Sequence, residues 1–153
     1  MVFEAEHARL WRSLLAHTGD PDVASDAVAE AFAQAVRRGE AVRDPAAWVW
    51  RAAFRIATGQ LAAARRSEPG GSPDVLVATA DTLPDDVVVL LDALARLPEA
   101  DRRVVVLSLV GGLPAAEVGR VVGATAGAVR VRLHRARRAL MAALAPEPAR
   151  EEP

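Results

Sequence analysis

Four residue types are missing from this sequence of 153 residues: cysteine, lysine, asparagine and tyrosine. Without cysteine the chain can form neither a disulfide framework nor a thiolate metal site. Imidazole comes only from His7, His17 and His134, which lie far apart in the sequence. A Cys or Lys nucleophile is thereby excluded and a zinc enzyme is disfavoured. We therefore expect no catalytic residue, no metal and no cofactor.

Long hydrophobic runs are missing as well. The longest apolar stretch, residues 104–113, contains Ser108 and two glycines and falls far below the ~20 residues that a membrane helix needs. The first residues, MVFEAEHARLW, are acidic and lack the basic and then apolar order of a signal peptide. These features predict a cytoplasmic protein that does not enter a membrane.

The charges are distributed unevenly, although the net charge is only −1. Residues 67–101 contain one Arg and eight acidic residues, a balance of −7. Residues 102–145 contain eight Arg and one Glu, a balance of +7. A basic C-terminal region beside an acidic connector is the first indication of an anionic partner.

A segment rich in proline, glycine and serine separates two helical regions. It begins with SEPGGSPD (67–74), and we place the whole linker at residues 67–84. No segment shows sustained alternation with a period of two, so the expected fold class is all-α. We expect two small helical domains, residues 1–66 and 85–145, joined by a flexible acidic linker and followed by a disordered tail at 146–153.

Prolines mark most of the expected helix starts. In Asp20-Pro21 and Asp44-Pro45, an N-cap carboxylate precedes a proline that suits the first helical turn. Apolar residues that recur every four positions then predict buried faces on the two helices. These are Val28, Phe32 and Val36 on one helix and Trp48, Ala52 and Ile56 on the other. Three further starts are marked by proline alone: Pro84, Pro98 and Pro114.

The stretch LPAAEVGRVVGATAGAVRVRLHRARRALMAAL (113–144) has the pattern of a helix-turn-helix. A short helix at 114–122 is followed by Gly123, which suits the tight turn, and by Thr125, which can cap the next helix. The inward positions of that second helix are expected at Val129, Leu133, Ala136 and Leu140. The C-terminal domain is therefore expected to be a helix-turn-helix.

The second helix of this motif carries five arginines in nine residues. Arg130, Val131, His134 and Arg135 lie on or beside the face opposite the inward positions, and Arg can pair bidentately with guanine or contact phosphate. The alternative is a solvent-exposed amphipathic helix that is rich in Arg only because the chain avoids Lys.

Residues 93–140 closely resemble region four of bacterial sigma factors of the extracytoplasmic-function (ECF) class. The matching residues are, in order, Leu97, Pro98, Arg102, Leu107, Gly112, Leu113, Glu117, Gly123, Gly127, Val129, Arg132, Leu133, Arg135, Ala136 and Arg137. The resemblance implies that this region reads the minus-thirty-five element of a promoter, and it adds Gly127 and Arg132 to the expected DNA contacts. The polar threonine and serine of the family fall on Ala128 and Val131.

The N-terminal half resembles region two of the same class. The family's aspartate-glutamate-phenylalanine helix appears as Asp26, Glu30 and Phe32, and its tryptophan helix appears as Trp48 and its neighbours. The resemblance implies that the helix carrying Asp26, Glu30 and Phe32 binds core RNA polymerase. Region two is degenerate, because the family's glutamine, asparagine, aspartate and arginine are replaced by Ala29, Arg55, Gly59 and Ala62.

In the family, the tryptophan helix and the preceding loop recognise and help to separate the minus-ten element. Here that role falls to Trp50, Arg51, Phe54 and Arg55. Two aromatics and two arginines, each pair four residues apart, suit base stacking and phosphate contact on a single strand. Each stacked base contributes on the order of 1–3 kcal/mol. The alternative is that Trp50 and Phe54 are core residues, and Trp48 is expected in the core.

The resemblance predicts a sigma factor that binds core RNA polymerase and promoter DNA, with an anti-sigma factor as an expected partner. In the family the acidic linker passes through the polymerase cleft, where its charge would mimic nucleic acid, and a plain tether is the alternative. Two other functions remain open. The chain could be a degenerate paralogue that does not drive initiation, or a free-standing helix-turn-helix regulator. An enzyme is disfavoured, because no catalytic constellation is found.

Overall fold

The structure, a computed structural model, describes residues 2–67 and 83–146. All regular secondary structure within these two ranges is helical, which confirms the predicted fold class. No helix within them is both long enough and apolar enough to span a lipid bilayer. Most of the expected linker, and the expected tail beyond residue 146, lie outside the described residues.

The N-terminal half contains α1 (Val2–Thr18), α2 (Pro21–Arg38), the short 3-10 turn η1 (Gly39–Ala41) and α3 (Pro45–Ser67). The Asp20 carboxylate accepts hydrogen bonds from the backbone N–H groups of Asp22 and Val23, at 2.9 and 3.2 Å. Asp44 accepts one from the N–H of Ala47 at 3.3 Å. Both predicted N-caps are therefore confirmed, and α2 and α3 begin where the Asp-Pro pairs place them.

The C-terminal half contains α5 (Asp85–Ala95), α6 (Glu99–Val105), the π-helical turn η2 (Val106–Val110), α7 (Ala115–Val122) and α8 (Ala126–Leu144). Pro84, Pro98 and Pro114 mark the starts of α5, α6 and α7, but each occupies the N-cap position and not the first helical turn. The turn η2 continues α6 with a wider spacing, because the N–H of Gly111 donates to the carbonyl of Val106 at 2.9 Å.

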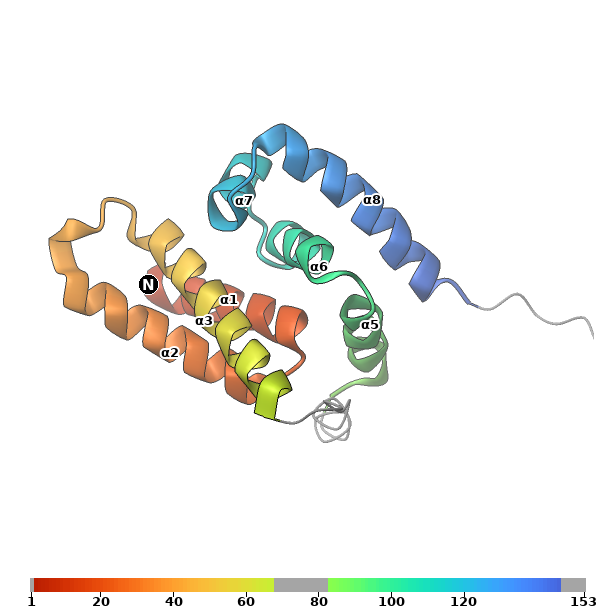
Figure 1. The fold of residues 1–153 in the computed structure, drawn as a ribbon, viewed down its shortest axis with the longest axis horizontal. Coiled ribbons are helices and arrows are strands. Elements are labelled where there is room, and N and C mark those ends of the chain that lie inside the picture. Colours follow the sequence, from red (N-terminus) through yellow and green to blue (C-terminus); the bar gives the residue numbers. More distant parts are fainter. Residues whose placement is uncertain (1, 68–82, 147–153) are drawn as a thin grey trace, which may run out of the picture.

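One hydrophobic core runs through both halves of the molecule. The helices α1 and α3 of the first half meet η2 and α7 of the second, and α1 also contacts α5 (Figure 1). The expected apolar stripe of α2 is only partly correct. Val28 is buried and Phe32 half-buried, but Val36 is 80% exposed near the C-terminal end of the helix. The division into two domains stays a prediction, and in this structure the halves are packed together.

Polar contacts also join the two halves. The buried Arg102 donates from Nη1 to the backbone carbonyl of His17 at 2.8 Å, and Arg103 donates from Nη2 to the Thr58 hydroxyl at 3.2 Å. The His17 ring is itself buried, with its centroid 5.4 Å from that of Phe54. Burial, together with the positive charges of Arg102 and Arg103, lowers the pKa of His17 to about 3. His17 is therefore a neutral residue of the contact region between the halves.

Candidate nucleic-acid interface

The helix-turn-helix forms as the sequence predicts. Gly123 ends α7 with a φ of 76°, a left-handed conformation that glycine adopts without steric cost. The Thr125 hydroxyl accepts a hydrogen bond from the N–H of Ala128 at 3.1 Å and caps α8. Sequence reasoning missed the role of Gly119. A Cβ atom at Gly119 would lie 2.4 Å from the carbonyl oxygen of Ala124, so the tight turn requires glycine there too.

One face of α8 is buried and the other is free. Val129, Ala136 and Leu140 are buried and Leu133 is half-buried, and these are the four predicted inward positions. Within the described residues, the main packing contacts of the helix are with α5, α6 and α7, which lie in its own half of the molecule. The predicted DNA-contacting residues are all exposed: Gly127, Arg130, Val131, Arg132, His134 and Arg135.

The arginines of α8 differ in how they are held. The guanidinium of Arg132 lies 3.6 Å from the Asp101 carboxylate of α6, so this side chain is directed along the flank of the motif. Arg130 and Arg135 make no side-chain hydrogen bond or ion pair with any residue in the described part of the chain. Their guanidinium groups are thus available to an external anion or base.

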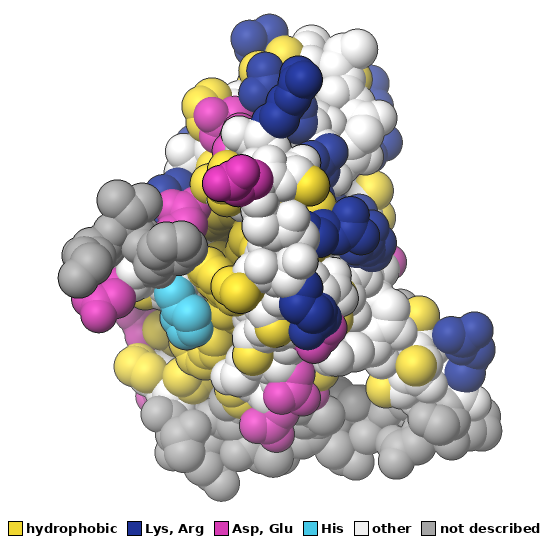
Figure 2. All heavy atoms as spheres, turned by 90° about the vertical axis from the view of Figure 1, so that its left-hand side faces the viewer, with side chains coloured by type: hydrophobic (Ala, Val, Ile, Leu, Met, Phe, Trp, Pro, Cys, Tyr) yellow, Lys and Arg dark blue, Asp and Glu magenta, His cyan; other side chains and the backbone are white. Residues whose placement is uncertain are grey.

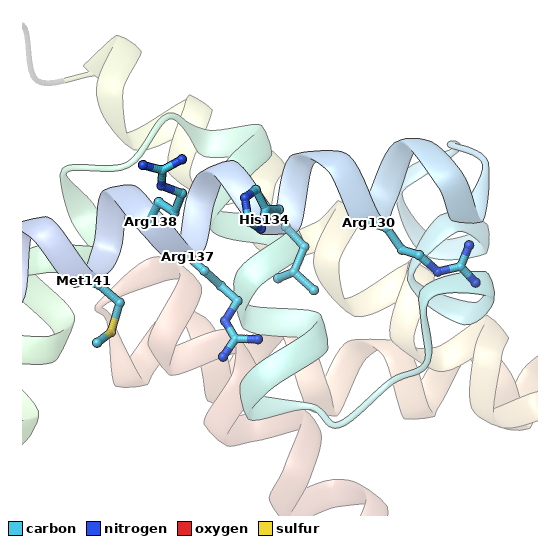
Figure 3. Close-up of a pocket in the computed structure, with 6 residues that line it drawn as sticks. Arg130, His134, Arg137, Arg138 and Met141 are labelled. Carbon is cyan, nitrogen blue, oxygen red and sulfur yellow. The ribbon is translucent and has the colours of Figure 1, made fainter.

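A hollow of about 600 Å³ lies along one side of α8, lined by Arg130, Leu133, His134, Arg137, Arg138 and Met141. Figure 3 shows the labelled side chains projecting from successive turns, with Arg137 and Arg138 pointing to different sides of the helix. Sequence reasoning did not assign Arg137 and Arg138 to the interface. Their positions extend the basic surface toward the C-terminal end of α8.

The structure corrects the prediction for Trp50 and Phe54. Trp50 is 1% exposed and Phe54 is 2% exposed, so neither ring can stack on a base in this arrangement. The Trp50 indole N–H donates to the Glu6 carboxylate, and a Cβ atom built on Gly111 would lie 3.0 Å from the indole ring. The reason is that α3 is covered by α1 and α2 and also by the C-terminal half. The alternative, that both rings belong to the core, is correct.

A different group of residues faces solvent at the start of α3. Arg38, Arg43, Trp48 and Arg51 line a hollow of about 360 Å³ with neighbours from the α2–α3 connection. The guanidinium of Arg38 lies 5.3 Å from the centroid of the Trp48 ring, within the range of a cation–π contact. Trp48 is half-buried and packs against the hydrophobic core, in line with the expected core position. Arg55 is exposed but does not line this hollow.

Exposed arginines stand beside apolar surface on one face of the molecule (Figure 2). On the face that Figure 2 shows, which is the left-hand side of Figure 1, hydrophobic side chains gather in the middle and Arg side chains lie above them and to their right. Sequence reasoning missed the contribution of Arg38 and Arg43. The Arg-Arg pair that ends α2 was a possible signal for Arg38, but the side on which these arginines lie depends on how the α2–α3 connection folds.

The residues expected to bind polymerase lie on two faces of α2. Asp26 and Glu30 are exposed, one helical turn apart. Glu30 accepts hydrogen bonds from Gln34 at 3.0 Å and from Arg37 at 3.1 Å, and these contacts hold the pKa of Glu30 below its usual range. Phe32 faces another way, because its ring stacks on His7 of α1 with centroids 5.9 Å apart. The structure therefore does not bring Phe32 together with the two carboxylates.

Known proteins resemble this chain in sequence. The family model described as Sigma-70, region 4 matches residues 88–140, which include α6, α7 and most of α8. The ECF RNA polymerase sigma factor SigL of Mycobacterium tuberculosis is 33% identical over 149 residues, covering 91% of this chain and 84% of SigL. The probable ECF RNA polymerase sigma factor SigI of the same species is 34% identical over 135 residues, covering 78% of this chain and 46% of SigI.

Solved structures share the fold. The sigma factor RpoE, crystallised in complex with the anti-sigma factor NepR from Bartonella quintana, aligns with a TM-score of 0.74 at 16% identity and covers 94% of each chain. The extracytoplasmic function sigma factor SigJ of Mycobacterium tuberculosis aligns with a TM-score of 0.65 at 27% identity, over 91% of this chain and 52% of SigJ. Because the 33% identity with SigL extends over 91% of this chain, the chain belongs to the ECF RNA polymerase sigma factors.

Proposed function

We propose that this sigma factor reads the minus-thirty-five element of its promoters with the exposed face of α8. As a member of its family, the chain directs RNA polymerase to promoters. We assign base contacts to Arg130, Val131, His134 and Arg135, which share the exposed face of the helix. Gly127 lies near the N-terminus of α8, where a helix in the major groove approaches the DNA backbone closely, and Arg132 contacts phosphate from the flank.

The observation that carries this assignment is the contrast between the two faces of α8. The buried face is fixed by α5, α6 and α7, so the helix is presented to solvent as a rigid rod. On the other face, Arg130 and Arg135 are exposed and unpaired within the described residues. An exposed guanidinium without an intramolecular partner has its N–H donors available for a phosphate or a base edge.

For the downstream, minus-ten element we propose the hollow that contains Trp48. Arg38, Arg43 and Arg51 surround the half-buried indole there, which combines a ring surface with cations, as single-strand binding requires. This replaces the role first expected of Trp50 and Phe54. Arg55, exposed one turn beyond Arg51, adds a phosphate contact.

For core RNA polymerase we propose the exposed face of α2 that carries Asp26 and Glu30. Their carboxylates would meet a basic or hydrogen-bond-donating surface, and Phe32 would support the helix from behind through His7. The free-standing regulator considered above is not favoured, because the similarity to SigL continues through the N-terminal half.

The polymerase, in this proposal, forms the phosphodiester bonds, so the chain itself has no catalytic role and acts in the cytoplasm, where the promoters are. An anti-sigma partner is also proposed, since the structurally similar RpoE of Bartonella quintana is bound by the anti-sigma factor NepR.

Selection of DNA sequences by the holoenzyme tests the assignment of α8. Replacing Arg130→Ala or Arg135→Ala should weaken binding by about 1–3 kcal/mol and relax the base preference at one position. The matched control is Arg96→Ala. Arg96 is an exposed arginine directly after α5 that pairs with Asp92, so its replacement should change neither quantity. If both α8 variants weaken all sequences equally, these arginines contact phosphate only and the base assignment is wrong.

A further inference from the structure

We propose that Val131 selects a thymine in the upstream element by contacting its C5-methyl group. The inference rests on the proposed function of α8 and names the chemistry of one of its contacts. Val131 is 54% exposed, although it is a branched apolar residue in the middle of a basic surface. Its side chain is not part of the hydrophobic core, so the fold does not account for it.

The direction of Val131 is fixed by the helix. Two positions along an α-helix correspond to a turn of about 200°, so Val131 points almost directly away from the buried Val129. Val131 also lies in the second turn of α8, and the N-terminal part of a recognition helix is the part that reaches base edges. Met141 is even more exposed, at 68%, but lies about 15 Å further along the helix. Val131 is thus the exposed branched side chain that α8 presents at its reading end.

The charges beside Val131 favour the same position. Arg132 is drawn to the flank by Asp101 at 3.6 Å, while Arg130 and Arg135 remain unpaired within the described residues. When these two arginines contact DNA, Val131 is brought between them against the base edges. Valine offers no hydrogen bond, and the only apolar group on the major-groove edges is the thymine methyl.

A β-branched side chain suits such a contact. In a helix, valine keeps essentially one χ1 rotamer, so both of its methyl groups are already positioned before binding. A serine at this position would instead offer a hydroxyl, which can bond to several bases. The expected consequence is a strict preference for thymine over cytosine at one position of the upstream element. At the positions read by arginine, base preference comes from hydrogen bonds instead.

Deoxyuridine tests this inference, because it differs from thymidine only by the missing methyl group. Holoenzyme assembled from core polymerase and the full chain is used to select a preferred upstream duplex, and each thymine is then replaced singly by deoxyuridine. For the unmodified protein, one replacement should weaken binding about fourfold, the size expected for burying one methyl group. The other replacements should have little effect.

Variants assign the methyl effect to a residue. With Val131→Ala, which suits a helix and alters only an exposed side chain, the deoxyuridine effect at that position should disappear. Ala128→Ser, at the other exposed apolar position near the start of α8, should leave the effect intact. Circular dichroism verifies that both variants keep the helical content of the unmodified protein.

The outcomes separate this inference from the proposed function. If no thymine is selected, if no deoxyuridine replacement matters, or if the effect persists in Val131→Ala, the contact with Val131 does not exist. Should Arg130→Ala and Arg135→Ala still relax base preference in that case, α8 remains the reading helix. If those two variants also leave base preference unchanged, α8 does not read the element and both proposals fail.

Discussion

The helices α3 and α8 carry similar sequence patterns but use them in opposite ways. Each combines arginines with apolar residues at helical spacing, and both patterns suggest a surface that contacts nucleic acid. In α8 the second face is exposed, because within the described residues the helix packs mainly against its own half of the molecule. In α3 it is covered, because the C-terminal half lies on it and encloses Trp50. Periodicity shows which residues share a face, but not how many faces are packed.

The largest expected effect comes from Trp50. Trp50→Ala should lower the free energy of unfolding by about 3–5 kcal/mol, since it removes a fully buried ring between the two halves. Urea denaturation followed by circular dichroism measures this loss. The matched variant Trp48→Ala should cost less stability, because its ring is half-buried, but should impair opening of the minus-ten region, as shown by permanganate footprinting. A stable Trp50→Ala protein that fails to open promoters would reverse the two roles.

A smaller effect is expected at Arg102. Arg102→Met keeps an unbranched side chain in place of the apolar stem of arginine but removes the guanidinium, which leaves the carbonyl of His17 without its donor from α6. An unsatisfied buried acceptor costs about 1–3 kcal/mol. Arg96→Met serves as the control, because the Arg96–Asp92 pair is exposed and should contribute no more than about 0.5 kcal/mol. Equal stability of the two variants would mean that the halves do not depend on this contact.

The smallest of these effects depends on pH and comes from His17. Its native pKa of about 3 lies below the ordinary 6.5, so the unfolded chain takes up a proton first as the pH falls. The contribution of His17 to the free energy of unfolding is therefore complete well above pH 6.5 and is lost progressively as the pH falls. The loss amounts to about 1.4 kcal/mol between about pH 7.5 and about pH 5.5. The groups that face the ring are Arg102 and Arg103 of α6 and Phe54 of α3.

Comparing stability curves of two histidine variants isolates this contribution. His17→Gln should remove the difference in stability between the two pH values. His7→Gln, at an exposed position on the same helix, should preserve it. If His17→Gln retains the full pH dependence, other groups are responsible and the ring of His17 is not the titrating residue.

Local features of the fold were predictable because they depend on neighbours in sequence. Asp20 and Asp44 cap helices with their own side chains, and Gly123 and Thr125 determine a turn within a few residues. The inward positions of α8 follow from the helical period alone. These local predictions were confirmed because they do not depend on where any distant segment lies.

Two of the features that were missed depend on how other parts of the chain are placed. The burial of Trp50 requires Gly111, some sixty residues away in sequence, to lie against its ring. The hollow around Trp48 requires a particular path of the α2–α3 connection. No period in the local sequence contains this information, so the candidate site at α8 was found in advance and the one at α3 was not.

The π-helical turn η2 also determines the orientation of the helices that follow it relative to α6. A π turn amounts to an α-helix with one residue inserted. Deleting one residue from Val106–Val110 would restore regular α-helical spacing and rotate everything that follows by about 100° about the axis of α6. The exposed face of α8 would then point in a new direction relative to α3, although each helix could remain folded. The relative orientation of the two surfaces proposed to read the promoter thus depends on chain length, by a single residue, and not on the chemistry of any side chain.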